Sequence, residues 1–249
     1  MLTNLQVQML KRIAPRSPEH GRAPQYHRNS QLSYLMGDDF FGRIAGKEVI
    51  DFGCGTGTDA IEIARKGAKR VIGIDVLAHY LELARQKAVD AGVQQTCTFV
   101  SSTTQLADVV VSVDAFEHFA DPAGILHTMN ALLRPSGEVN ISFGPTWYHP
   151  LGGHLFSIFP WAHLIFSEEA LIRWRSTFKN DGATRFSEVA GGLNQMTIGR
   201  FEELVAASPL TLRSLELVPI GKLRVVHNRF TREYTTAIVR CRLTKRKSP

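Results

Sequence analysis

The sequence contains few cysteines, and those it has do not form a disulfide framework. Cys54, Cys97 and Cys241 are an odd number of thiols without regular spacing. This argues against a disulfide-stapled secreted scaffold and predicts reduced thiols in a cytoplasmic protein. No run of about 18 apolar residues is present, so we expect no membrane-spanning helix. We also expect no signal peptide, because polar residues interrupt the first apolar stretch.

Internal repeats and low-complexity segments are absent as well. What the sequence does contain is enough apolar material for a packed core, since 44% of its 249 residues are hydrophobic. This length fits one large domain or one domain with an insertion. The net charge of +6 is mild, so it permits an acidic partner without requiring one.

The most informative stretch runs from residue 48 to residue 76. Its order is a short β-branched strand, a glycine-rich turn, a helix, and a second strand that ends at Asp75. Three glycines alternate in the turn: Gly53, Gly55 and Gly57. They let the backbone turn sharply and approach a ligand, because a Cβ would block that approach. A carboxylate about 20 residues after the turn suits ribose hydroxyls, so the stretch predicts a nucleotide-type site.

A carboxylate at the end of the first strand indicates which kind of nucleotide-like ligand the turn binds. Asp51 precedes the first glycine by two residues and would repel a pyrophosphate, whereas it suits the ammonium and sulfonium of S-adenosylmethionine (SAM). Thr58 also stands where the dinucleotide pattern requires glycine. We expect Thr58 or Asp59 to cap the following helix. The D-x-G-x-G-x-G pattern resembles the first motif of class I SAM-dependent methyltransferases, over about residues 30–143 and 197–243.

This resemblance implies a Rossmann-like, doubly wound, seven-stranded α/β sheet, mostly parallel, with one antiparallel strand near the edge. Residues 1–29 would form an N-terminal basic arm that starts with a helix over residues 2–13. Residues 30–249 would form the methyltransferase domain, with a cap insertion at about 144–196. Further helices are expected over 30–44, 78–91, 122–134, 156–166, 167–178 and 197–207. Further strands are expected over 96–100, 108–113, 138–143, 210–220 and 234–243.

The same resemblance assigns cofactor contacts for SAM, whose demethylated product is S-adenosylhomocysteine. Asp51 and the three glycines would frame the aminoacyl end, Asp75 would hold the ribose, and Val76 would pack on adenine. Ser102 stands in place of the acidic residue that family members often carry after the third strand, and it would approach the adenine edge. Ser112 and Asp114 would border the methionine moiety.

Methyl transfer is an in-line displacement, so the protein chiefly aligns the acceptor and needs a base only for an acceptor that keeps its proton. The candidate bases are His118, which follows the fourth strand, and His149 and His154 in the insertion. His118 and His154 are preferred because both should face the pocket mouth, although a structural role stays open for each histidine. No metal is assigned.

One alternative does use a metal. The spacing of Asp114, Glu117 and His118 resembles the E-x-x-E-H site of metal-dependent O-methyltransferases, among them the ubiquinone-pathway and small-RNA 3′-end enzymes. Such a set could hold Mg²⁺ or a similar ion, with His149 or His154 as a further ligand.

The predicted enzyme methylates an oxygen, nitrogen or carbon of a small aromatic or apolar metabolite. The insertion's aromatic residues suggest such an acceptor, unless they form the cap's own core or a contact with an oligomer or membrane surface. An RNA methyltransferase and a non-catalytic SAM-binding subunit stay open. We do not expect nucleic acid, because the basic residues are dispersed. A homodimer is also open.

Overall fold

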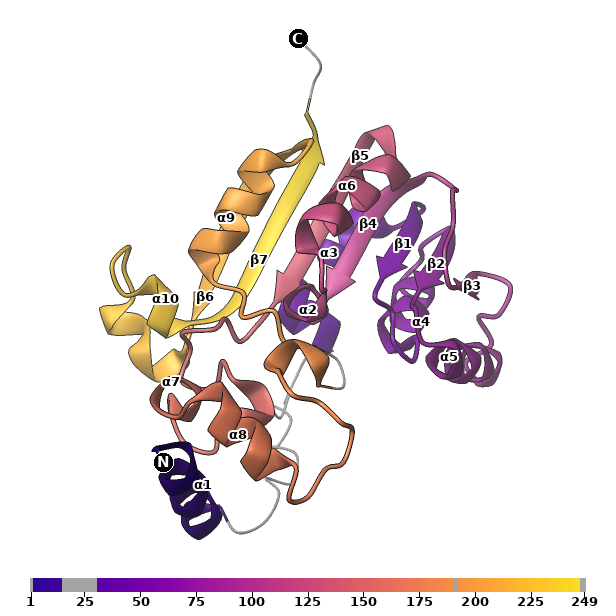
Figure 1. Ribbon diagram of the computed structural model, residues 1–249. Coiled ribbons are helices and arrows are strands. Elements are labelled where there is room, and N and C mark those ends of the chain that lie inside the picture. Colours follow the sequence, from indigo (N-terminus) through magenta and orange to yellow (C-terminus); the bar gives the residue numbers. More distant parts are fainter. Residues whose placement is uncertain (1, 15–30, 190–191, 247–249) are drawn as a thin grey trace.

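A seven-stranded sheet forms the centre of the computed structural model, which describes residues 2–14, 31–189 and 192–246 (Figure 1). The strand order is β3-β2-β1-β4-β5-β7-β6. β7 runs antiparallel to both β5 and β6, and the other pairings are parallel. The predicted sheet with a single antiparallel strand is therefore confirmed. Its strands are β1 (Glu48–Phe52), β2 (Arg70–Ile74), β3 (Cys97–Val100), β4 (Ala107–Val113), β5 (Leu133–Phe143), β6 (Leu210–Pro219) and β7 (Thr236–Lys245).

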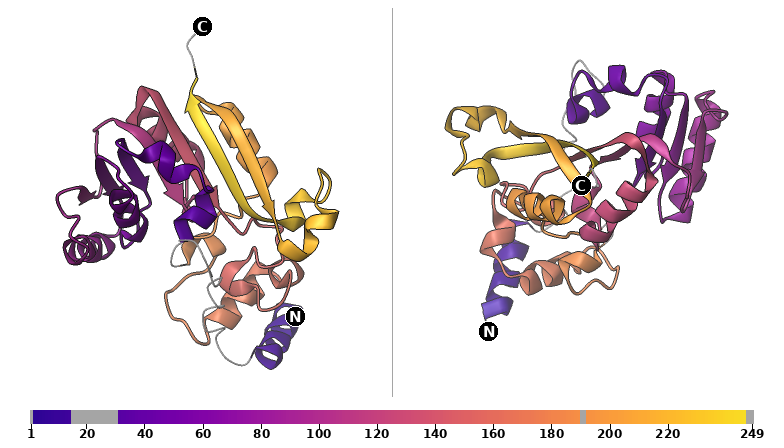
Figure 2. Two further views of the ribbon diagram at one scale, coloured as in Figure 1. Left: turned by 180° about the vertical axis from the view of Figure 1, so that it is seen from behind. Right: turned by 90° about the horizontal axis from the view of Figure 1, so that it is seen from above.

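Helices cover both faces of this sheet (Figure 2). The central strands β1 and β4 are largely apolar and have nearly every side chain buried, as expected when both faces are covered. Apolar side chains of α6 (Pro122–Leu132) and α9 (Ile198–Ala207) pack on one face. Four helices pack on the other: α2 (Gln31–Met36), α3 (Phe40–Ile44), α4 (Thr58–Arg65) and α5 (Ala78–Asp90).

Several element boundaries differ from the sequence prediction. The single helix expected over 30–44 is divided at Gly37, whose φ of 92° ends α2 before α3 begins. The helix expected over 156–166 is reduced to η2 (His154–Phe156) and α7 (Ala162–Ile165), because Pro160 lies between them. α8 (Glu168–Arg175) also ends before residue 178.

The insertion has a core of its own, and the N-terminal helix is part of it. Apolar residues of α1 (Leu2–Ile13), α7 and α8 and of η3 (Phe186–Glu188) form a third cluster that includes Leu10, Phe156 and Trp174. The indole Nε1 of Trp174 donates to the carbonyl of Ala14 over 3.0 Å. The remainder of the predicted basic arm, residues 15–29, lies outside the described residues. None of the described helices is both long and apolar enough to cross a bilayer.

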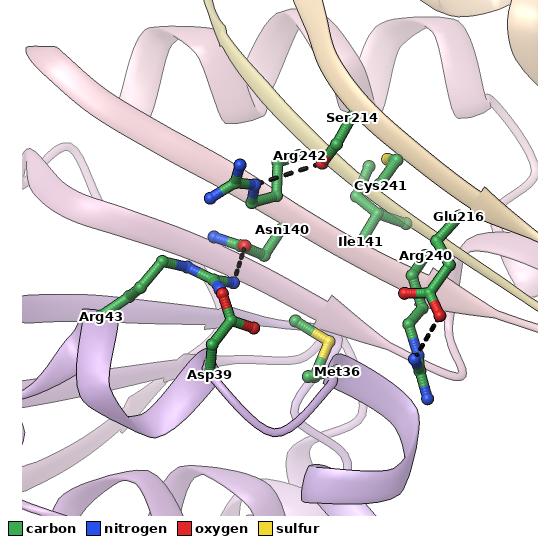
Figure 3. Close-up of a pocket in the computed structure, with 10 residues that line it drawn as sticks. All are labelled: Met36, Asp39, Arg43, Asn140, Ile141, Ser214, Glu216, Arg240, Cys241 and Arg242. Atoms are coloured by element: carbon green, nitrogen blue, oxygen red, sulfur yellow. Dashed lines mark hydrogen bonds and ion pairs between the residues drawn. The ribbon is translucent and has the colours of Figure 1, made fainter.

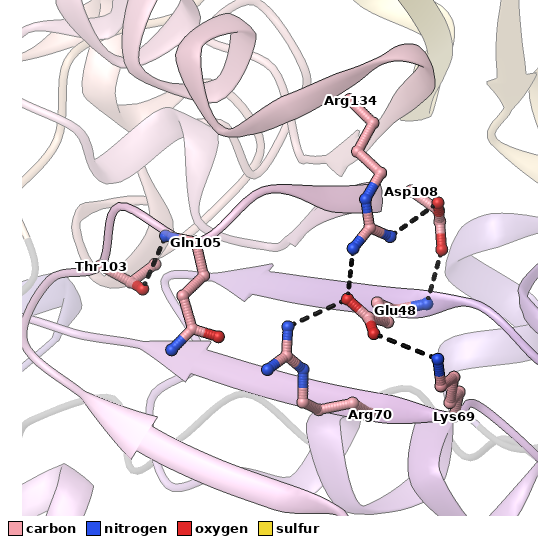
Figure 4. A network of polar contacts seen from close by, with 7 residues as sticks. All are labelled: Glu48, Lys69, Arg70, Thr103, Gln105, Asp108 and Arg134. Atoms are coloured by element: carbon pink, nitrogen blue, oxygen red, sulfur yellow. Dashed lines mark hydrogen bonds and ion pairs between the residues drawn. The ribbon is translucent and has the colours of Figure 1, made fainter.

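The strands begin at a charged network, at the end of the sheet away from the cap (Figure 4). Glu48 accepts hydrogen bonds from Arg134 over 2.6 Å and from Arg70 over 2.9 Å. Arg134 also donates to Asp108 over 2.9 Å. Since these residues start β1, β2, β4 and β5, the network ties the strands together at one end and leaves the other end for a site.

A cleft of about 210 Å³ lies on the face of β5, β7 and β6, beside α2 and α3 (Figure 3). Arg43 donates to Asn140 over 3.0 Å, Arg240 to Glu216 over 2.9 Å, and Arg242 to Ser214 over 3.2 Å. The remaining structure, η1 (Phe116–His118), η4 (Gly221–Val226) and α10 (Arg232–Thr235), lies in loops. Because the cleft lies beside the middle of the strands, it is distinct from the predicted site at their carboxyl ends.

Candidate active site

The glycine turn follows β1, where the parallel strands end toward the cap (Figure 1). Gly53, Gly55 and Gly57 all have a left-handed backbone, with φ of 83°, 50° and 75°. A Cβ on Gly55 would meet nothing within 4 Å, so this residue leaves an open surface. A Cβ on Gly57 would lie 2.7 Å from Ala84 and 2.8 Å from the Phe99 ring. Gly57 is therefore also required for packing against α5 and β3. The ligand contact of the three glycines stays a prediction, with Gly55 facing open space.

The start of α4 also corrects the prediction. Its N-cap is Gly57, without any side-chain cap, so neither Thr58 nor Asp59 has the expected capping role. Asp59 is instead partly buried beside Asp51. Burial raises the pKa of Asp59 to about 6, with a contribution from the nearby Glu62 charge.

Carboxyl groups with raised pKa values gather beneath the turn. Asp51 is 2% exposed, and its Oδ2 has no hydrogen-bond partner among the described residues. Burial, followed by the charge of Asp59, holds the pKa of Asp51 well above its usual range. Asp114 reaches the surface, yet desolvation by the surrounding chain raises its pKa to about 7, with Glu117 and Asp59 adding to the effect. Carboxyl groups in this state would be stabilised in their ionised form by a bound cation.

The predicted ribose and adenine contacts lie at the ends of β2 and β3. The two oxygens of Asp75 each accept a backbone hydrogen bond over 2.9 Å, one from Gly55 and one from Leu77, so the side chain is held in place. Each oxygen keeps a further lone pair. Val76 is 87% exposed, and Ser102 is exposed as well. Ser112 is instead fully buried within β4, with no partner for its hydroxyl among the described residues.

Glu117, His118 and His154 converge at the cap side of this edge. Each offers a ligand atom, and these atoms lie within 4.8 Å of one another. Glu117 and His118 belong to η1 after β4, whereas His154 begins η2 in the insertion with a φ of 50°. Among the described residues, no other three side chains of histidine, cysteine or acidic residues lie close enough together to bind one metal ion. We call it the Glu117–His118–His154 cluster.

Hydrogen bonds leave one ligand atom of each side chain unused. Nδ1 of His118 lies 2.9 Å from the carbonyl of Gly192, which requires a proton on Nδ1 and leaves Nε2 as an acceptor. Glu117 uses Oε1 to accept from the Gly144 amide over 3.3 Å. Glu117 Oε2 and His154 Nε2 are buried without a partner among the described residues. Two orphaned polar atoms in one place indicate a site for a ligand.

Burial shifts the protonation of this cluster. It raises the pKa of Glu117 to about 7 and lowers the pKa of His154 to about 4, where the neighbouring His118 contributes as well. At neutral pH the His154 imidazole is therefore uncharged. A group with this pKa is a weak general base but an available metal ligand, which favours binding over the base role expected for it.

The other candidates lie outside the cluster. His149 accepts from the Leu151 amide over 2.9 Å at Nδ1, which stabilises its own turn, and burial lowers its pKa to about 4. Asp114, expected to share a metal with Glu117 and His118, has a φ of 47° and instead accepts a hydrogen bond from Gln31. His163 is buried between Ser157 and the Trp147 carbonyl, at 2.9 and 2.7 Å.

Two cavities share His118, Gly192 and Leu193 in their walls. One has a volume of about 350 Å³ and a mixed lining, with Phe119 and Ala120 beside charged residues such as Arg185 and Arg200. The other is about 120 Å³ and lies against His154. The cluster therefore borders space into which a small molecule fits.

A family model described as a methyltransferase domain matches residues 11–189. A ubiquinone biosynthesis O-methyltransferase from Sodalis glossinidius is 39% identical over 126 residues, which is 48% of this chain and 49% of the relative. The chain thus matches about half the length of such relatives.

Solved structures resemble the whole chain more weakly. Geranyl diphosphate C-methyltransferase from Streptomyces coelicolor A3(2) has a TM-score of 0.58 at 13% identity, covering 87% of this chain and 78% of its own. The [4+2]-cyclase SpnF has a TM-score of 0.58 at 14% identity, covering 99% and 95%. At these identities the likeness is one of fold, and the cyclase shows that the fold is not restricted to one reaction.

Proposed function

The chain belongs to the class I SAM-dependent methyltransferases, and from that premise we propose that it methylates an oxygen atom of a small aromatic or apolar acceptor. The observation that carries the choice of oxygen is the Glu117–His118–His154 cluster, with its two orphaned ligand atoms. A hydroxyl needs help to lose its proton at neutral pH, and the cluster borders the cavities where it would lie. The O-methyltransferase relative agrees with this choice.

The cofactor residues follow from the charges beneath the turn. SAM supplies a methyl group on a sulfonium and also carries an ammonium. Asp51, Asp59 and Asp114 would hold this cationic end, since a positive charge offsets the desolvation and the mutual repulsion that raise their pKa values. Asp75 would accept from the ribose hydroxyls, while Val76 offers an exposed apolar surface for adenine. Ser102, which is exposed after β3, would meet the adenine edge, whereas Ser112 is buried within β4.

The cluster fits a divalent cation held by Glu117 Oε2, His118 Nε2 and His154 Nε2. Two imidazoles with one carboxylate suit a transition metal such as Zn²⁺, Mn²⁺ or Co²⁺ better than Mg²⁺, which prefers oxygen ligands. When bound, such an ion would polarise the acceptor hydroxyl and favour its ionised form. The Gly192 carbonyl fixes the ring of His118, and Gly144 fixes the carboxylate of Glu117.

The test measures S-adenosylhomocysteine formation with matched phenols and anilines. We expect turnover of the phenols, loss of turnover on chelation with EDTA, and recovery with Mn²⁺ or Zn²⁺ to a greater extent than with Mg²⁺. Glu117→Gln should abolish the metal response, whereas Glu188→Gln, an exposed carboxyl outside the cluster, should not. Methylation confined to anilines and indifferent to chelation would contradict the proposal.

A metal-free version is the second candidate, because the hydrogen bond to Gly192 leaves His118 Nε2 free to accept a proton. His118 would then act as the general base for the same hydroxyl. In that case EDTA has no effect, and His118→Ala loses activity that returns as the pH rises and the acceptor ionises by itself. The chelation experiment therefore separates the two versions.

A further inference from the structure

The N-terminal helix presents an apolar stripe to solvent. α1 packs against α8 through Leu10, which is fully buried, yet four large apolar residues on its outer side are exposed. Their exposed fractions are 70% for Leu2, 55% for Leu5, 45% for Met9 and 53% for Ile13. Positions 2, 5, 9 and 13 recur at helical spacing, so they form one continuous stripe. A soluble monomer seldom exposes such a row without a use for it.

A second apolar projection comes from the other end of the chain. The segment between β6 and β7 forms η4 and a turn before α10. Val225 is 93% exposed and Phe230 is 77% exposed. The guanidinium carbon of Arg229 lies 4.4 Å from the centroid of the Phe230 ring. The segment thus carries protruding apolar side chains with a cation stacked on one of them.

These two segments lie on the same side of the molecule. In Figures 1 and 2, α1 and α10 occupy one side, α7 lies between them, and α5 lies on the opposite side. α7 adds Leu164 and Ile165, which are 40% and 60% exposed. We call this side the apolar–basic face. It is formed by α1, α7 and residues 221–232.

The charged side chains of the two outer segments, residues 2–13 and 221–232, are all basic. Residues 2–13 and 221–232 contain no aspartate or glutamate. They contain six basic residues, namely Lys11, Arg12, Lys222, Arg224, Arg229 and Arg232. Of these, Arg232 pairs with Glu202. Apolar side chains between exposed lysines and arginines are typical of proteins that bind the surface of an anionic bilayer, where the apolar groups enter the interface and the cations meet headgroups.

We propose that the apolar–basic face binds the surface of an anionic lipid bilayer, with α1 and the 221–232 segment as two separate points of contact. The charge complementarity favours this occupant over a second copy of the chain, whose matching face would be equally basic. The inference goes beyond the proposed function, because it concerns surface residues outside the candidate active site. It also places the cap, and the cavities beside it, next to the lipid.

The experiment is co-sedimentation of the full chain with unilamellar vesicles of phosphatidylcholine alone or mixed with phosphatidylglycerol. We expect binding to the anionic vesicles, little binding to the neutral ones, and weakening at high salt. Leu5→Glu with Met9→Glu should reduce binding by about tenfold or more, and Phe230→Glu should do so independently. Leu83→Glu on α5, where Leu83 is 50% exposed, is the matched control and should bind like the parent.

Circular dichroism shows whether each variant keeps its fold. If the α1 variant unfolds, Phe230→Glu in the other segment still tests the proposal. Equal binding to neutral and anionic vesicles would overturn the proposal, and so would equal losses in Leu83→Glu. A dimer that Leu5→Glu with Met9→Glu dissociates, without any vesicle binding, would assign the face to a second copy. Binding of single-stranded RNA that excludes vesicles from the same segments would assign it to nucleic acid.

Discussion

His118 and His154 lie edge to face, with ring centroids 5.2 Å apart, although one follows β4 and the other belongs to the cap. Burial keeps the His154 imidazole neutral, because its pKa falls to about 4. The Gly192 carbonyl fixes the tautomer of His118. The two rings and the Glu117 carboxyl therefore bring one ligand atom each to within 4.8 Å of one another, and this relationship supports the cation-binding role given to the cluster.

His154→Ala should remove a ligand without collapsing the cap. We expect at least the 10- to 100-fold loss of metal affinity typical of disturbed metal sites, together with a fall in kcat, because loss of an outer-shell partner alone costs about that much. Metal content by mass spectrometry and turnover with a phenol measure this. His163→Ala is the control: it breaks two buried hydrogen bonds and should cost about 1–3 kcal/mol of stability while metal content stays unchanged.

Asp51→Asn should separate binding from stability. The amide keeps the shape of the side chain but cannot balance the cationic end of SAM, so we expect roughly tenfold or weaker SAM affinity by calorimetry. The unliganded protein should be as stable as the parent or more stable, because a buried group with a strongly raised pKa is replaced by a neutral one. Asp90→Asn, on the exposed end of α5, should change neither quantity.

Stability and SAM affinity should respond to pH in opposite directions. The pKa of Asp59 rises to about 6 and that of Asp114 to about 7 in the folded chain, from 3.8 for both groups unperturbed. Each group is protonated in both states below about pH 4. As the pH rises toward 7, the unfolded chain loses this proton before the folded chain does, so the free energy of unfolding decreases. Cationic SAM prefers the ionised groups, so its affinity should increase between pH 5 and 8. Urea unfolding and calorimetry across this range would show both trends. A SAM affinity that is flat with pH would contradict the assignment.

Gly57→Ala and Gly55→Ala should differ in stability, although both residues have a left-handed backbone. An alanine at position 55 meets open space, so only the backbone penalty of about 1–2 kcal/mol applies. At position 57 the new methyl also overlaps Ala84 and Phe99, adding about 1–3 kcal/mol. Urea denaturation should rank Gly57→Ala as clearly less stable. S-adenosylhomocysteine titration of the folded fraction should in turn show the larger affinity loss in Gly55→Ala.

Local sequence patterns predicted more of the fold than of the candidate site. The strand, turn and strand from Glu48 to Asp75 follow from short-range periodicity and backbone geometry, and the seven-stranded sheet agrees with them. The packing requirement at Gly57 could not be predicted, since its neighbours Ala84 and Phe99 come from later elements. Asp59 was missed as a partly buried acid because a carboxylate at a helix start also fits a capping role.

The cluster needed tertiary information. Glu117 and His118 are adjacent in sequence, so their spacing already indicated a site. His154 joins them only because the loop after β5 returns over η1, in a left-handed conformation that histidine rarely adopts. Sequence spacing equally permitted Asp114 as the third member, yet that carboxyl is directed to Gln31. A signal that could have favoured His154 is its place directly after Gly152 and Gly153, which allow the close approach of that loop.

The contact between α1 and the cap joins residues far apart in time as well as in sequence. Ala14 leaves the ribosome long before Trp174, its partner across 160 positions, has been made. Until then the first helix has no surface on which to bury Leu10. Assembly of the cap is therefore a late event that depends on long-range contacts. Until most of the chain has been translated, the apolar side chains of the first helix remain exposed.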